Sequence, residues 1–207
     1  MTSVPETLFG DRIRLRRWRD EDRGPFAAMN ADPRVMEFFP TTLSRAESDA
    51  LADRIEAHFG RHGFGLWAVE VPGVAPFTGF TGLSVPRFEA PFMPCVEIGW
   101  RLAVAHWGNG YATEAARLAL DCGFRTLGLA EIVSFTAATN LRSRGVMERL
   151  GLHHDPSDDF DHPSLPEGHP LQQHVLYRLA SGAIQMRLSS GQPASTSAGG
   201  KTSSRVL

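Results

Sequence analysis

The sequence predicts a single-domain mixed α/β fold, and three observations support this. Segments typical of strands and helices alternate through the second half of the chain. In the first half, two strand-like segments joined by Pro72-Gly73 predict a β-hairpin. The 207 residues include 42% hydrophobic and 21% charged residues, close to the globular average. We therefore expect one domain over residues 1–188 and a disordered Ser- and Gly-rich tail over residues 189–207.

The first half of the chain is expected to supply two helices and three strands. Apolar and basic residues alternate over residues 13–16, which is typical of a short strand. Asp20 is a candidate N-cap for a helix that continues to residue 30. Ser44 and Glu47 have the spacing of a capping box and indicate a second helix, which should end within residues 60–63. The hairpin strands are expected at residues 66–71 and 77–85.

The second half is expected to contain two strand-to-helix units and a closing strand. Asn140 is a natural N-cap and Gly151 a natural C-cap for the second of the two helices. A long loop rich in Asp, His and Pro covers residues 153–170. The expected elements are a strand at 96–104, a helix from the following Gly-rich turn to about 127, a strand at 131–136, a helix at 140–150 and a strand at 174–179.

Composition excludes several classes of protein. The 21 Lys and Arg residues against 23 Asp and Glu residues give a formal charge of −2, so no basic excess favours nucleic acid or an anionic membrane. The chain has neither a signal-peptide pattern nor an apolar run of about 18 residues. Cys95 and Cys122 are too few for a disulfide framework. We therefore expect a cytoplasmic protein with no nucleic-acid or membrane partner.

The Gly-rich turn around Gly108 and Gly110 is a candidate anion site. A strand that enters a helix through small residues leaves backbone N–H groups free at the positive end of the helix dipole. A P-loop is excluded because no lysine follows the second glycine. A Rossmann site fits poorly, since Thr113 replaces the third small residue and Glu131 begins its strand instead of ending it. On the turn alone, a surface turn without a ligand is an equal alternative.

Two segments together resemble the acetyl-CoA-binding segments of the GNAT acetyltransferases, in particular the RimJ/RimL-like branch. The first reads Glu-Ile-Gly-Trp and then Trp-Gly-Asn-Gly-Tyr-Ala-Thr-Glu-Ala, beginning at Glu97. The second reads Thr-Asn-Leu-Arg-Ser from Thr139, followed by Val-Met-Glu-Arg-Leu-Gly-Leu. The resemblance extends from Thr7 to Leu179 and implies a central sheet that splits, with acetyl-CoA as co-substrate. It departs from the broad family pattern at Trp107, where Gln or Arg is usual.

The resemblance also implies which residues contact acetyl-CoA. In the family the pantetheine arm lies in the split of the sheet and the Gly-rich turn holds the pyrophosphate. Asn140 would bond the pantetheine or acetyl amide, although Asn140 and Ser143 are equally typical of a helix start. Arg142 would meet the 3′-phosphate, or would simply lie on an exposed helix face. The remaining implied contacts are Leu102 and Val104 for pantetheine, and Gly108, Asn109, Gly110, Ala112 and Thr113 for the pyrophosphate.

Glu97 and Ser143 are the candidate catalytic residues. Several branches of the family have a strand glutamate at the position of Glu97 as general base; the alternative is a surface carboxylate paired with Arg101. The family's tyrosine acid falls near Met147, which cannot donate a proton, so Ser143 or a water is expected to serve the leaving thiolate. A backbone N–H near Val104 would polarise the acetyl carbonyl.

The predicted function is transfer of an acetyl group to a primary amine, above all an N-terminal α-amino group of a protein or peptide. The alternatives are a non-catalytic acyl-CoA sensor, an enzyme for a small amine such as an antibiotic or polyamine, and, more weakly, a Rossmann oxidoreductase. No metal is expected, because the histidines and aspartates of residues 153–170 lack zinc-site spacing. Those aspartates are expected to attract a cationic amine or to be solvated. A homodimer is compatible with the sequence.

Overall fold

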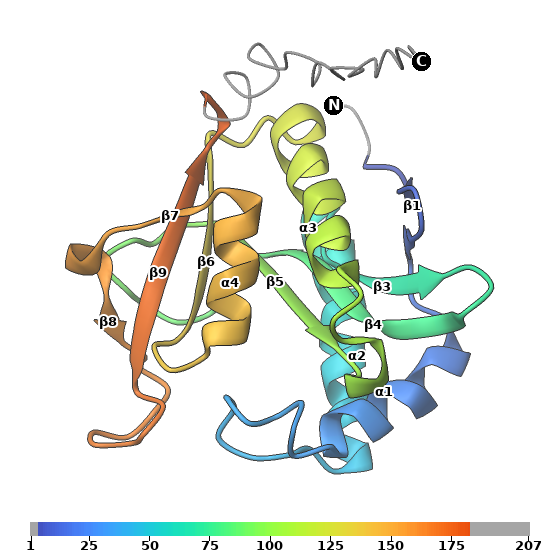
Figure 1. The fold of residues 1–207 in the computed structure, drawn as a ribbon, viewed down its shortest axis with the longest axis horizontal. Helices are drawn as coiled ribbons and strands as arrows, with labels where there is room; N and C mark the ends of the chain where they lie inside the picture. Colours follow the sequence, from blue (N-terminus) through green and yellow to red (C-terminus); the bar gives the residue numbers. More distant parts are fainter. Residues whose placement is uncertain (1–3, 183–207) are drawn as a thin grey trace, which may run out of the picture.

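The computed structural model describes residues 4–182, which form one mixed sheet with helices on both faces (Figure 1). Residues 183–207, including the tail expected at 189–207, lie outside the described residues. The helices are α1 (Arg23–Ala31), α2 (Arg45–His62), α3 (Tyr111–Asp121) and α4 (Leu141–Leu150). The strands are β1 (Thr7–Phe9), β2 (Arg14–Arg16), β3 (Leu66–Val71), β4 (Ala75–Ser84), β5 (Glu97–Leu102), β6 (Glu131–Ala137), β7 (His153–His154), β8 (Phe160–Asp161) and β9 (Gln173–Ala180).

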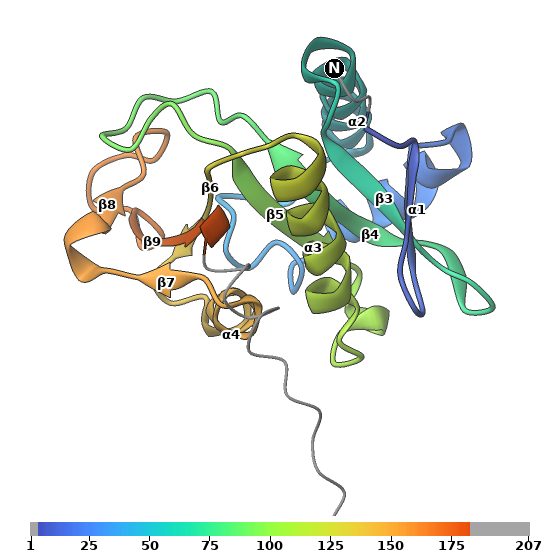
Figure 2. The same ribbon diagram turned by 90° about the horizontal axis from the view of Figure 1, so that it is seen from above.

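The strands follow the order β1-β2-β3-β4-β5-β6-β9-β7, and β8 also pairs with β9. All of these pairs are antiparallel except β5 with β6. Helices α3 and α4 lie on one face of the sheet and α2 lies on the other (Figures 1 and 2). The mixed α/β fold expected from the sequence is confirmed. No helix within residues 4–182 is long and apolar enough to span a membrane.

The helix boundaries follow local capping signals. Ser44 Oγ accepts from the Glu47 amide at 3.3 Å, and the Glu47 carboxylate accepts from the Ser44 amide at 2.8 Å, so the expected capping box is present. Gly63 (φ 73°) ends α2 and Gly151 (φ 85°) ends α4, both in the left-handed region. Asn140 caps α4 as expected. These predictions are confirmed because each depends only on residues close in sequence.

The prediction that Asp20 caps the first helix is wrong. Residues 20–22 form a 3₁₀ turn, and α1 begins at Arg23. The carboxylate that organises this turn is that of Asp22, which accepts from the Arg19 amide at 2.8 Å and forms an ion pair with Arg16 at 2.7 Å. Both members of this pair are buried, and burying Arg16 requires a carboxylate partner. The tertiary ion pair, rather than helix capping, therefore sets the start of α1.

The sheet splits between β5 and β6. The two strands pair only at Glu97 and Val133, where the Val133 amide donates to the Val96 carbonyl at 2.9 Å. The Ser134 hydroxyl then bonds the Ile98 carbonyl at 2.8 Å, and beyond this point the strands diverge. The backbone N–H and C=O groups of the odd-numbered residues of β5 point toward β4. The hydrogen bond from the Ala103 amide to the Thr78 carbonyl shows this alternation. The backbone groups of Trp100 and Leu102 therefore point into the gap.

Candidate active site

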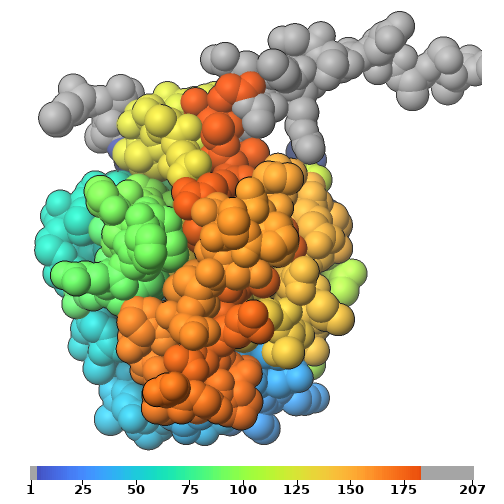
Figure 3. All heavy atoms as spheres, turned by 90° about the vertical axis from the view of Figure 1, so that its left-hand side faces the viewer, coloured from blue at the N-terminus to red at the C-terminus, as the bar shows by residue number. Residues whose placement is uncertain are grey.

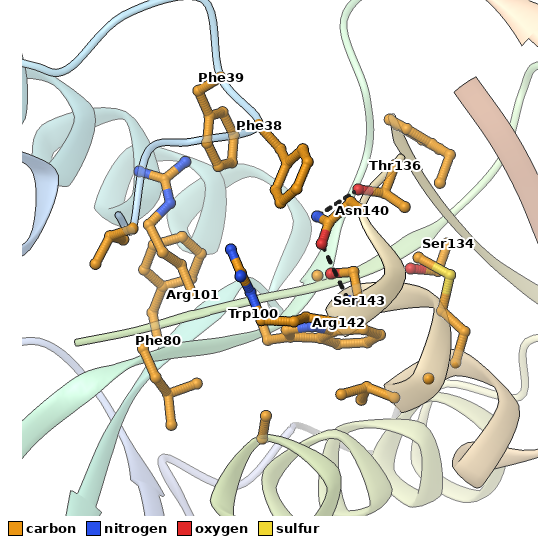
Figure 4. Close-up of a pocket in the computed structure, with 18 of the residues that line it drawn as sticks. Phe38, Phe39, Phe80, Trp100, Arg101, Ser134, Thr136, Asn140, Arg142 and Ser143 are labelled. Carbon is orange, nitrogen blue, oxygen red and sulfur yellow. Dashed lines mark hydrogen bonds between the residues drawn. The ribbon is translucent and has the colours of Figure 1, made fainter. Parts of the chain in front are cut away.

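A cavity of about 1080 Å³ opens along the split of the sheet. Strands β4, β5 and β6, the turn before α3, the start of α4 and the connection between α1 and α2 all contribute to its lining (Figure 4). Nine of the eleven site residues expected from the sequence line this cavity. They are Glu97, Leu102, Gly108, Gly110, Ala112, Thr113, Asn140, Arg142 and Ser143.

The turn before α3 has the properties of an anion site. Gly108 (φ 76°) and Gly110 (φ 80°) are both left-handed, and α3 begins without a side-chain cap. The amides of Ala112 and Thr113 donate to no group in residues 4–182, so the first turn of α3 has free donors. A Cβ at Gly108 would meet nothing within 4 Å, which leaves room for a ligand. These features fit the pyrophosphate of acetyl-CoA.

Asn109 and Val104 are not among the residues that line the cavity, so their expected contacts with acetyl-CoA stay predictions. The side-chain amide of Asn109 donates to the carbonyls of His106 and Trp107, at 3.3 and 3.0 Å, and so stabilises the turn from within. Val104 begins a 3₁₀ turn because β5 ends at Leu102. The N–H groups that face the gap belong to Trp100 and Leu102, so these replace Val104 as candidates for polarising an acetyl carbonyl.

Asn140 and Ser143 lie at the start of α4, beside the gap (Figure 4). Asn140 Oδ1 accepts from the Ser143 amide at 3.2 Å, and its amide group donates to Thr136 Oγ1 at 2.9 Å. The side chain of Asn140 is therefore engaged in capping, the alternative that its residue type favoured. The Ser143 hydroxyl lies on the cavity and has no hydrogen-bond partner within residues 4–182. It is free to bond a ligand.

Within the described part of the chain, no cationic side chain pairs with the Glu97 carboxylate. Its neighbour across the sheet is Ser84, whose hydroxyl donates to Glu97 Oε2 at 3.4 Å. Desolvation raises the pKa of Glu97 to about 8, and the hydrogen bond from Ser84 opposes this only in part. The expected alternative, a pair with Arg101, is wrong because Arg101 donates to Asn30 Oδ1 at 2.7 Å. Glu97 thus has the properties of a general base that ionises near neutral pH.

Arg142 connects α4 to the opposite wall of the cavity. It forms an ion pair with Glu37 in the connection between α1 and α2. Its guanidinium carbon also lies 4.8 Å from the ring centroid of Trp107 and 5.4 Å from that of Phe38. Arg142 therefore connects two walls of the cavity through its Nη2 group, and its expected contact with a 3′-phosphate stays a prediction.

One wall of the cavity was not expected from the sequence. The connection between α1 and α2 contributes Phe38 and Phe39, and β5 contributes Arg101, whose guanidinium carbon lies 4.0 Å from the Phe39 ring centroid (Figure 4). Phe39 is 40% exposed. The available signal was two consecutive phenylalanines in a segment expected to be a loop, where large apolar side chains suggest a binding surface.

The segment rich in His and Asp contributes little charge to the cavity. Asp158 forms an ion pair with Arg178 at 2.7 Å, and Asp159 Oδ1 lies 2.8 Å from His154 Nε2, so both carboxylates already have partners outside the cavity. The aspartates of this segment do not line the cavity, so any attraction of a cationic amine would act from outside it and stays a prediction. Within residues 4–182, no three His, Cys, Asp or Glu side chains come together as a possible metal site.

Instead, this segment completes an aromatic wall. Phe160 packs against Phe92 with ring centroids 4.9 Å apart and so joins β8 to the connection between β4 and β5. On the surface, the connection between β4 and β5 (green) lies beside the segment that contains β8 (orange) (Figure 3). His162 and His174 lie beside this cluster, and burial lowers the pKa of both. His162 and His174 also line the cavity. This end of the cavity is therefore aromatic and uncharged at neutral pH.

The family model described as an acetyltransferase (GNAT) domain matches residues 12–153. The chain belongs to the GNAT acetyltransferase family. The family match agrees with the free amides in the first turn of α3, and the protein is an acetyl-CoA-dependent acetyltransferase.

Two relatives and two solved structures illustrate the similarity. The chain is 32% identical over 148 residues to the uncharacterized protein YkkB of Bacillus subtilis, covering 71% of this chain and 85% of YkkB. It is 32% identical over 155 residues to the FsC-acetyl coenzyme A-N(2)-transacetylase of Aspergillus fumigatus, covering 72% of this chain and 65% of the relative.

Among solved structures, an acetyltransferase from Agrobacterium tumefaciens has a TM-score of 0.67 at 27% identity, covering 86% of this chain and 96% of that one. The RimJ protein of Mycobacterium smegmatis, solved with CoA-disulfide, has a TM-score of 0.70 at 19% identity, covering 88% and 90%. The similarity to RimJ concerns the fold alone.

Proposed function

We propose that this GNAT enzyme acts in the cytoplasm and acetylates the α-amino group of a protein or peptide N-terminus, as some members of the RimJ/RimL-like branch that it resembles do. The observation that carries the proposal is the position of Glu97, the one carboxylate among the described residues that line the cavity, where desolvation raises its pKa to about 8. An α-amino group has a pKa of about 7.7–8.0, whereas that of lysine is about 10.4. A base and an amine with similar pKa values exchange a proton at little cost, so Glu97 suits an α-amino group better than lysine.

The chain's own residues account for the steps of the reaction. Acetyl-CoA supplies an acetyl thioester when it is bound, with its pyrophosphate at the amides that precede and begin α3. Glu97 accepts the proton that the amine loses as the new C–N bond forms. The amides of Trp100 and Leu102 are placed to polarise the acetyl oxygen. Ser143 donates to the sulfur as the C–S bond breaks, so the departing charge is met by a hydroxyl.

A panel of acceptors tests this function. Thiol release is measured with peptides that have free N-termini, with lysine peptides whose N-termini are blocked, and with polyamines. We expect turnover with the free N-termini at pH 7 to 8. Turnover confined to lysine peptides or polyamines would contradict the α-amino assignment. Saturable acetyl-CoA binding without product from any amine would identify a sensor instead.

A small amine is the second candidate acceptor, favoured by one relative. The Aspergillus relative is named as an acetyl coenzyme A-dependent N(2)-transacetylase of FsC, and it aligns with 72% of this chain. Small amines with and without a free carboxylate therefore belong in the same panel.

Changing Ser143 to alanine is expected to lower kcat about 10- to 100-fold, with little change in acetyl-CoA binding. The hydrogen bond to sulfur strengthens as negative charge develops, so its loss affects the transition state more than the ground state. The cap of α4 survives because Asn140 bonds the Ser143 amide, not its hydroxyl. Kinetics alongside acetyl-CoA titration measure both effects, with Ser157→Ala as a control outside the cavity. Unchanged kcat in Ser143→Ala would leave Ser143 a helix-start residue only.

A further inference from the structure

Buried Arg16 and half-buried Arg101 lie in opposite electrostatic environments. Arg16 is surrounded by acceptors: it pairs with Asp22 at 2.7 Å and with Glu70 at 2.9 Å, and it donates to the Pro76 carbonyl at 2.6 Å. The hydrogen bond and charge of Asp22 raise the pKa of Arg16 despite burial. This is the usual arrangement for a buried cation, because an unpaired charge is costly to remove from water.

Arg101 has no such partner. Within residues 4–182 no carboxylate lies within ion-pair distance of its guanidinium. Its one hydrogen bond to these residues goes from Nη1 to the neutral amide of Asn30, and its buried Nε has no partner. The rings of Phe39 and Phe80 lie 4.0 and 5.4 Å from the guanidinium carbon. Desolvation lowers the pKa of Arg101 to about 10, which still leaves it charged at neutral pH.

The unpaired guanidinium lines the same cavity as the candidate base. Glu97 and Arg101 are four residues apart on β5, and alternate residues of a strand share a face, so both project from one side of the sheet. Figure 4 shows Arg101 beside Phe39 and Phe80 on the cavity wall. Among the described residues that line the cavity, Glu97 is the one carboxylate, and Arg142 already pairs with Glu37.

We propose that Arg101 binds a carboxylate carried by the acceptor amine. The proposal rests on the acetyl transfer proposed above and deepens it by naming the substrate class, an amine that also bears an anion. A guanidinium offers several N–H donors to a carboxylate, and the Nη2 group of Arg101 is neither buried nor bonded to the described residues. The carboxylate comes either from an acidic side chain near a peptide N-terminus or from a small amino acid. Polyamines are disfavoured, because they would bring a second cation to Arg101.

Matched acceptor pairs test the proposal. The first pair is two hexapeptides with free N-termini, identical except for Asp or Asn at the second position, with a further pair that differs at the first position. The second pair is 4-aminobutyrate and its amide. We expect the wild-type enzyme to prefer the carboxylate member of at least one pair about 10- to 100-fold in kcat/KM, the worth of one charge-assisted interaction. Preference in the peptide pairs assigns the carboxylate to a peptide, and preference in the second pair alone assigns it to a small molecule.

Variants of Arg101 show whether this residue causes the preference. Arg101→Met keeps the apolar stem against Phe39 and should abolish the preference by raising KM for the carboxylate member, with the amide member nearly unchanged. Arg101→Lys retains the positive charge but not the planar guanidinium, so it should keep part of the preference for the carboxylate member. Arg117→Met, an exposed change on α3, is the matched control for loss of a positive charge. The melting temperature and the acetyl-CoA titration of each variant establish that it is folded.

A binding measurement keeps this proposal separate from the proposed function. If no acceptor is turned over, the transfer to amines fails, and the thermal shift that each peptide causes is compared instead. The Asp peptide should raise the melting temperature of the wild-type protein more than the Asn peptide does, and Arg101→Met should remove the difference. Equal behaviour of both members of every pair in the wild-type protein would overturn the proposal. A preference that survives in Arg101→Met would also overturn it.

Discussion

Replacing Ala112 with glutamate is expected to abolish acetyl-CoA binding while the protein remains folded. Ala112 is the second residue of α3, where its amide and that of Thr113 have no acceptor. A carboxylate there would occupy the anion site and repel the pyrophosphate, yet it would favour the helix through the dipole. A ligand at 100 times its Kd stabilises a protein by about 2.7 kcal/mol. For a domain of this size that corresponds to a thermal shift of about 5–10 °C, which the variant should lose.

Ala112→Gln is the matched control, because it adds the same bulk without the charge. It should retain a larger part of the acetyl-CoA shift than Ala112→Glu. Gly110 is a poorer choice for this test, since its φ of 80° strains any L residue and a substitution would disturb the turn as well as the ligand. ATP and NADH should not reproduce the shift in the wild-type protein. The same acetyl-CoA shift in Ala112→Glu and wild type would place the pyrophosphate elsewhere.

Replacing Glu97 with glutamine is expected to lower turnover at pH 7 by about 10²- to 10⁴-fold, the range typical of a lost general base. The pKa of Glu97 is raised to about 8, so wild-type activity should rise with pH through that value as the carboxylate ionises. The variant lacks this group, and its rate should follow the fraction of neutral amine instead. The difference between the two enzymes should therefore narrow above the pKa of the amine. Initial rates from pH 6 to 10 measure both profiles.

The raised pKa of Glu97 also determines how Glu97→Gln changes the stability of the fold. Between the ordinary value of 4.5 and about 8, the folded protein holds a proton on Glu97 that the unfolded chain releases. Proton binding at Glu97 therefore stabilises the folded protein fully below pH 4.5, and this stabilisation is lost as the pH rises to about 8. Glu97→Gln should thus gain in melting temperature relative to wild type between pH 5 and 9. Glu89→Gln, an exposed change between β4 and β5, is the control. Equal rates and equal stability profiles in Glu97→Gln and wild type would exclude Glu97 as the base.

The sequence predicts those parts of the site that depend on local signals. The turn before α3 is recognisable because glycine spacing and helix start lie within a few residues, and Asn140 is recognisable as a cap for the same reason. The strand that carries Glu97 is evident from its own pattern. The role of Asp22 cannot be recognised from the sequence, because the alternating pattern around Arg16 indicates only a short strand and gives no sign of their ion pair.

The acceptor side of the cavity could not be predicted in this way. Arg101 pairs with Asn30 across 71 residues of sequence, and Phe39 covers Arg101 from a connection with no regular structure. Nothing in the neighbourhood of Arg101 along the chain distinguishes it from an exposed strand arginine that pairs with Glu97. Its isolation from carboxylates exists only after the connection between α1 and α2 has folded onto β5.

The divergence of β5 from β6 has a consequence for how the two halves of the sheet move. The halves share one paired position at Glu97 and the bond from Ser134 to Ile98, so few backbone bonds resist their separation. A ligand that bonds the amides of Trp100 and Leu102 on one side and α4 on the other would replace the hydrogen bonds that β5 and β6 do not form with each other. Hydrogen exchange at those two amides should slow when such a ligand binds, and the halves should then unfold as one cooperative unit. The concentration of acetyl-CoA would therefore determine how cooperatively the two halves of the sheet unfold, whether or not an acceptor is present.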